Sequence, residues 1–142
     1  MTRFLLSLAA AGVLVAATAA HLPAQPAADA VFTAEQAAAG ARTYAASCAS
    51  CHAADLGGRP EAPQLAGSDF MFTWSGQTTL DLFRYVQGMP PGGPRLTEAE
   101  YLTIVAFILE QNGATPGATP YAADTAVPIK SVATGERPGG RR

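Results

Sequence analysis

The segment Cys48-Ala49-Ser50-Cys51-His52 constrains the fold of this chain most strongly, because it holds both cysteines of the 142-residue sequence. Two cysteines are too few for the several disulfides that hold many small secreted domains together. Their spacing lets one helical turn present both thiols on the same side, with an imidazole directly after them. We therefore expect the three side chains to act together on one bound group.

The C-x-x-C-H pattern is the attachment site for c-type haem. In that chemistry the thiols of Cys48 and Cys51 add across the haem vinyl groups as thioethers, and His52 binds the iron through Nε2. The sequence thus predicts one covalently bound haem c, and the cofactor uses both cysteines of the chain.

Three other interpretations of the motif are weaker. A redox-active C-x-x-C favours a βαβ setting, for which the sequence gives no sign. A zinc site needs four ligands, and the only other histidine is His21, in a segment that we expect to be removed or flexible. A structural disulfide between Cys48 and Cys51 is possible but leaves His52 without a role.

The sixth iron ligand is predicted to be Met89, in the turn Gly88-Met89-Pro90-Pro91-Gly92. A turn rich in proline and glycine can hold a thioether toward a metal without the geometric demands of a helix. Most methionines only fill gaps in a core, but Met89 does not lie on a helix face. Met71 is the alternative ligand.

The two ends of the chain differ from its middle. Residues 1–20 have the layout of a secretory signal peptide, with one early positive charge, an apolar run and an A-x-A-like cleavage site after Ala19. Export to the periplasm is expected, and the alternative is a retained N-terminal anchor that faces the periplasm. Residues 21–30 are expected to form a flexible lead-in, and residues 114–142, rich in Ala, Gly and Pro, are expected to be a disordered tail.

Residues 31–113 remain for one compact domain, and three helices are expected in it. Thr33 and Thr97 each begin a capping box, which predicts helices over residues 33–49 and 97–111. A shorter helix is expected over residues 79–87. The residues expected to be buried on the second and third of these helices are Leu80, Leu82, Phe83, Val86, Tyr101, Ile104, Val105 and Ile108.

Residues 53–78 contain many glycines and prolines and are expected to be mostly loop. So long a loop in a small domain indicates that the chain wraps around something. The fold class is therefore all-α, with three main helices and long irregular loops around one haem.

Charge excludes one class of partner. The whole chain has a net charge of −2, and residues 30–112 have four arginines, eight acidic residues and no lysine. No basic cluster is present that would follow a nucleic-acid backbone. Membrane contact is expected only if the N-terminal segment is retained.

The motifs together resemble the class I cytochromes c, the monohaem bacterial proteins whose iron has histidine and methionine ligands. The resemblance covers residues 33–113. Gly40-x-x-x-Tyr44-x-x-x-Cys48 is similar to the first helix of that family, in which the glycine lets the last helix cross closely. Phe107 lies where the family has the aromatic partner of that crossing.

The resemblance implies further haem contacts. Pro63-Gln64-Leu65-Ala66-Gly67 is similar to a family segment whose proline carbonyl accepts a hydrogen bond from Nδ1–H of the proximal histidine, while its leucine packs on the haem. Trp74 lies where family members often place an indole N–H near a haem propionate, and Arg95 is a second candidate for that contact. The pattern around Trp74 and Met89 is also similar to cytochrome subunits of quinoprotein dehydrogenases.

The function that the resemblance implies is single-electron transfer between periplasmic redox partners, or within a larger complex, rather than catalysis. We expect a monomer or a subunit of a complex, with a donor and an acceptor that the sequence does not identify. The alternatives are a haem enzyme or gas sensor with an open sixth position, and a structural or assembly role in which the haem is incidental.

Overall fold

The computed structural model describes residues 30–139. The expected signal peptide and residues 21–29 of the expected lead-in lie outside the described residues. In chain order the helices are α1 (Ala34–Ser47), α2 (Ala49–His52), α3 (Ser68–Trp74), α4 (Thr79–Val86), α5 (Glu98–Gln111) and α6 (Ile129–Val132). Residues 30–139 contain isolated β-bridges but no strand, which confirms the all-α prediction. None of the helices in this range is long and apolar enough to cross a membrane.

Capping boxes begin α1, α4 and α5. In each helix the N-cap threonine accepts a hydrogen bond from the third helical residue, whose side chain returns one to the N-cap backbone. Thr33 and Thr97 were predicted from the sequence to be such N-caps, and Thr78 adds a third. Of the residues expected to be buried on α4 and α5, all but the half-buried Leu80 lie in the core.

The contact between α1 and α5 forms the centre of the fold. Gly40 lies so close to α5 that an added Cβ would overlap the carbonyl oxygen of Thr103. Beside this contact the rings of Tyr44 and Phe107 pack with centroids 5.3 Å apart and an interplanar angle of 52°. The glycine-backed crossing and its aromatic partner, both expected from the resemblance, are therefore present.

Helix α3 was not expected, because residues 53–78 were predicted to be mostly loop. The helix has only seven residues, and its N-cap is Gly67, which has φ of 92° and no side chain to signal a helix start. Its buried side chains, Phe70 and Trp74, lie four residues apart and so share one face. That spacing is the only sequence signal for α3.

The prediction of a disordered tail is wrong for residues 114–139. Tyr121 and Ile129 are only 2% and 0% exposed, and Ile129 begins α6. The tail bonds to the start of α4, since the Tyr121 hydroxyl donates to the Thr79 carbonyl at 2.7 Å and Thr79 N donates to the Val127 carbonyl at 2.9 Å. Tyr121 and Ile129 lie in the core, and Val127 and Val132 pack partly buried against it, which average composition did not reveal.

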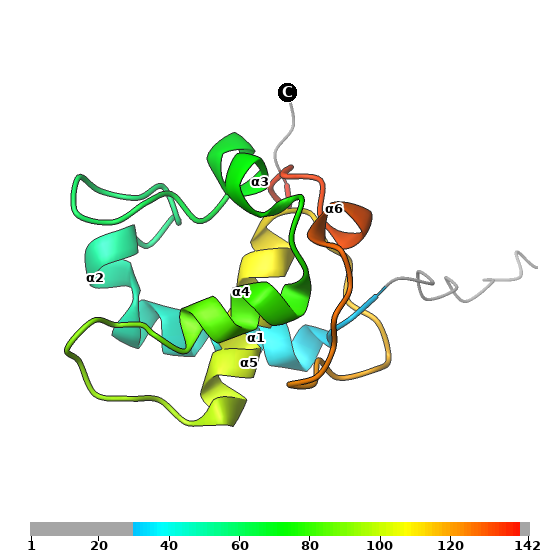
Figure 1. The fold of residues 1–142 in the computed structure, drawn as a ribbon, viewed down its shortest axis with the longest axis horizontal. Coiled ribbons are helices and arrows are strands. Elements are labelled where there is room, and N and C mark those ends of the chain that lie inside the picture. Colours follow the sequence, from blue (N-terminus) through cyan, green and yellow to red (C-terminus); the bar gives the residue numbers. More distant parts are fainter. Residues whose placement is uncertain (1–29, 140–142) are drawn as a thin grey trace, which may run out of the picture.

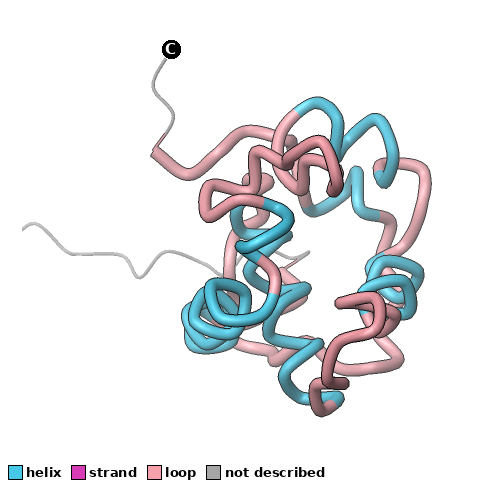
Figure 2. Tube along the Cα trace, turned by 90° about the vertical axis from the view of Figure 1, so that its left-hand side faces the viewer, coloured by secondary structure: helices cyan, strands magenta, loops and turns pink. Residues whose placement is uncertain are grey.

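Two irregular segments project on the same side of the molecule as α2. In Figure 1 the segments 53–67 and 87–97 both project on the side where α2 lies, away from α6 and the tail. Figure 2 shows helices and irregular segments alternating around the periphery of the trace. The residues expected to hold the cofactor come from α2, from Cys48 directly before it and from these two segments, except Trp74, which lies on α3.

Candidate functional site

The C-x-x-C-H segment forms one helical turn directly after α1. The backbone N–H groups of Cys51 and His52 both donate to the Cys48 carbonyl, at 3.2 and 2.9 Å. Both thiols are free, with Cys51 exposed and Cys48 half-buried, which contradicts the disulfide interpretation. Burial, and then the neighbouring Cys51, raise the pKa of the Cys48 thiol. Among residues 30–139 no three His, Cys, Asp or Glu side chains gather as a metal site, so a zinc site gains no support.

His52 is oriented by the segment that the resemblance indicated. Its Nδ1 lies 2.8 Å from the carbonyl oxygen of Pro63. Because a carbonyl oxygen only accepts hydrogen bonds, Nδ1 must carry the proton, which leaves the lone pair of Nε2 free to bind a metal. This contact is the one expected for Pro63.

Tyr44 fixes the backbone on the other side of the histidine. Its hydroxyl donates to the Ala53 carbonyl at 2.8 Å, directly after His52. Burial is the main cause that raises the pKa of Tyr44, and the charges of Cys48 and Asp55 act in the same direction. Sequence reasoning gave Tyr44 only a packing role, although a buried tyrosine hydroxyl generally requires a partner.

Asn112 holds the Pro63–Gly67 segment in place and was missed as a site residue. Its side chain is fully buried, and Nδ2 donates to the Leu65 carbonyl at 2.9 Å while Oδ1 accepts from Gly67 N at 2.9 Å. The sequence indicated only a helix stop at Asn112-Gly113. The side chain of Leu65 is half-buried, and its expected contact with the haem stays a prediction.

The turn that carries Met89 is tied to α5. The Tyr101 hydroxyl donates to the Met89 carbonyl at 2.7 Å, and Leu96 N donates to the same hydroxyl at 3.3 Å. Met89 N donates to the Val86 carbonyl at 2.9 Å, so the turn also continues directly from α4. The side chain of Met89 is half-buried. Sequence reasoning placed Tyr101 in the core without this second role.

The remaining candidates lie in different surroundings. Trp74 is 9% exposed and packs edge-on against Tyr85 with ring centroids 5.2 Å apart. Met71 is half-buried beside the tail, where a Cβ on Gly135 would lie 2.7 Å from its Cγ. Arg95 is exposed. The propionate contacts suggested for Trp74 and Arg95 stay predictions.

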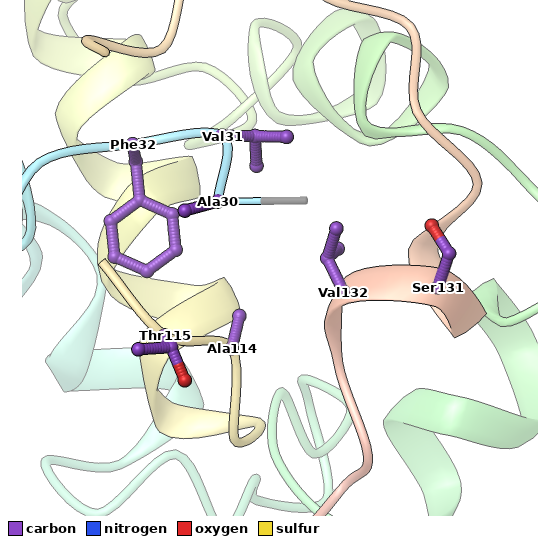
Figure 3. A pocket seen from close by; sticks show the side chains of 7 residues that line it. All are labelled: Ala30, Val31, Phe32, Ala114, Thr115, Ser131 and Val132. Carbon is purple, nitrogen blue, oxygen red and sulfur yellow. The ribbon is translucent and has the colours of Figure 1, made fainter. Parts of the chain in front are cut away.

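A cavity of about 110 Å³ lies elsewhere in the fold (Figure 3). It lies between the start of the described chain, the residues after α5, and α6. Its lining residues are Ala30, Val31, Phe32, Ala114, Thr115, Ser131 and Val132. None of these is a titratable group or belongs to the C-x-x-C-H segment, so this cavity is separate from the candidate site.

The donor groups around α2 fit a c-type haem. Two free thiols on one helical turn match the two thioether bonds, and the orientation of His52 leaves Nε2 available to iron. The comparison with protein families gives an independent result, since the family model described as cytochrome C oxidase, cbb3-type, subunit III matches residues 35–108. Comparisons with curated proteins and with solved structures give no match. The chain therefore belongs to this family, as a monohaem class I cytochrome c with covalently bound haem.

Proposed function

We propose that this protein carries single electrons between redox partners, with His52 and Met89 as the axial ligands of its haem iron. Membership of the family supports electron transfer by a haem. The 2.8 Å contact between His52 Nδ1 and the Pro63 carbonyl is the observation that supports His52 as a ligand. The assignment of Met89 rests on its position in the turn Gly88-Met89-Pro90-Pro91-Gly92. When bound, the haem supplies an iron that accepts and releases one electron.

The contact with Pro63 favours one tautomer of His52, with the proton on Nδ1. The Pro63 carbonyl fixes the Nδ1 proton and the ring orientation, and this hydrogen bond raises the basicity of Nε2. Asn112 keeps the Pro63–Gly67 segment in position through Leu65 and Gly67. Little rearrangement is then needed at the proximal ligand when the charge on the iron changes.

Met89 supplies a soft thioether, which stabilises the reduced iron relative to a second histidine and raises the reduction potential. With His52 and Met89 both holding the iron, the bound haem would have no open position for a substrate. In this proposal Leu65 packs on the haem face, and Trp74 donates its indole N–H to a propionate. This ligand set favours a carrier over an enzyme or a gas sensor.

The proposed location is the periplasm, because residues 1–20 have the layout of a signal peptide. The proposed partners are periplasmic or membrane-bound redox proteins. The family description names an oxidase subunit, and the sequence also resembles cytochrome subunits of quinoprotein dehydrogenases. Both are consistent with a role as a free carrier or as the cytochrome subunit of a larger complex.

The substitution Met89→Ala in the holoprotein tests the ligand assignment. We expect the ferric protein to lose the sulfur-to-iron charge-transfer band, its reduction potential to fall, and the ferrous iron to bind carbon monoxide. Met71→Ala is the matched control, since Met71 is also half-buried, and it should keep the band. Retention of the band in Met89→Ala would refute the assignment. Binding of carbon monoxide by untreated wild-type protein would instead favour an enzyme or gas sensor.

A further inference from the structure

Tyr101 connects α5 to both ends of the turn that carries Met89. Its side chain is 3% exposed, and its hydroxyl donates to the Met89 carbonyl at 2.7 Å. The same hydroxyl accepts a hydrogen bond from Leu96 N at 3.3 Å. A single buried oxygen therefore holds the first and the last residue of segment 89–96.

Segment 89–96 has few internal backbone hydrogen bonds to fix its conformation. It contains Pro90, Pro91 and Pro94, which have no backbone N–H to donate. The internal backbone bond of the turn runs from Gly93 N to the Pro90 carbonyl at 3.2 Å. Residues 91–95 are all exposed. The position of Met89 thus depends on its attachment to α4 and on the Tyr101 hydroxyl.

We propose that Tyr101 is a positioning residue for the axial ligand Met89. Its hydroxyl bonds to the main chain of Met89, so its effect is on how often the thioether is displaced from the iron. This inference rests on the proposed function, in which Met89 is a ligand. Loss of the hydroxyl removes the side-chain hydrogen bonds at both ends of the segment and leaves Met89 held by its bond to the Val86 carbonyl, so that an exogenous ligand competes more successfully with Met89.

Tyr121 provides a matched control within the same chain. It is 2% exposed, and its hydroxyl also donates to a backbone carbonyl at 2.7 Å, in this case that of Thr79. Thr79 lies at the first turn of α4, at the opposite end of that helix from Met89. Tyr121→Phe therefore removes a donated hydrogen bond of the same length as the one from Tyr101 to Met89, and leaves the Met89 turn attached to α5.

The experiment compares wild-type, Tyr101→Phe and Tyr121→Phe holoproteins. Imidazole is titrated into each ferric protein while the sulfur-to-iron charge-transfer band is followed, and unfolding by urea is measured in parallel. We expect Tyr101→Phe to bind imidazole roughly 2- to 10-fold more tightly than wild type, the factor that corresponds to one net hydrogen bond. Tyr121→Phe should lose similar stability but keep the wild-type imidazole affinity.

Three other results would each contradict a specific part of this inference. Wild-type affinity in Tyr101→Phe, with the band present in wild type, means that Tyr101 is only a core residue. Equal shifts in both variants mean that general loosening of the fold, rather than the Met89 turn, controls ligand displacement. Absence of the band in the wild-type protein itself would refute the proposed Met89 ligation, and with it this inference.

Discussion

The substitution Ile129→Ala tests the docking of the C-terminal tail, the point on which sequence and structure differ most. Ile129 is fully buried in the first position of α6, and its N–H donates to the Gln77 carbonyl at 2.9 Å. Truncation of a buried isoleucine to alanine costs about 2–5 kcal/mol, because the lost transfer free energy adds to the cost of the cavity. That is a large part of the 5–15 kcal/mol by which such domains are typically stable.

The assay is urea unfolding of the mature holoprotein, followed by far-UV circular dichroism. Ile129→Val should lose about 0.5–1.5 kcal/mol, and Ile129→Ala the larger amount. Lys130→Ala is the control, because Lys130 is the next residue and its side chain is exposed, so that a change within about 0.5 kcal/mol is expected. If Ile129→Ala were as stable as Lys130→Ala, the tail would not be docked as the structure describes.

Two further predictions concern α1 and α5. A glycine-to-alanine substitution normally stabilises a helix interior. Gly40→Ala should instead lower the free energy of unfolding by about 1–3 kcal/mol, because the new Cβ overlaps the Thr103 carbonyl. A urea midpoint at or above that of wild type would contradict this prediction. Hydrogen bonds from the backbone and side chain of Thr97 hold the pKa of Glu100 below its usual 4.5. The charged Glu100 side chain therefore contributes to stability above pH 4.5, and this contribution is lost as the pH falls through the lowered pKa. Glu100→Gln keeps the capping geometry without a charge, and its urea midpoint should fall less than that of wild type on acidification; parallel curves would refute the assignment.

The local features of the fold were predictable because their signals are local. Thr33 and Thr97 are each followed three residues later by Gln or Glu, and both capping boxes form as expected. The start of α3 at Gly67 has no side-chain cap, so no comparable signal was present in the sequence. Short helices that depend on packing, rather than on caps, are the ones that this kind of reasoning misses.

The features of the candidate site also separate into those with a local sequence signal and those without one. The C-x-x-C-H turn was clear from spacing alone, and the contact between His52 and Pro63 was expected only from the family resemblance. The hydrogen bonds of Asn112 were not foreseen, because its partners lie as far as 47 residues away in the sequence. Those of Tyr101 were not foreseen, because its hydroxyl bonds to the backbone of an irregular segment, which leaves no pattern in the sequence. The chemical groups that bind a ligand are thus easier to predict than the buried polar groups that hold them in position.

The docked tail also changes the expected surface. Residues 30–112 have no lysine, but α6 adds the exposed Lys130 to the folded unit. Arg137 donates from Nη1 to the Asp55 carbonyl at 2.7 Å, three residues after His52, so a positive charge from the tail lies close to the haem-attachment segment. Residues 30–139 still have a net charge of −4, because the tail adds two basic and two acidic residues. The net negative charge therefore attracts a basic partner at long range. The tail changes the charge close to the attachment segment, and charge complementarity at short range there selects the orientation of docking.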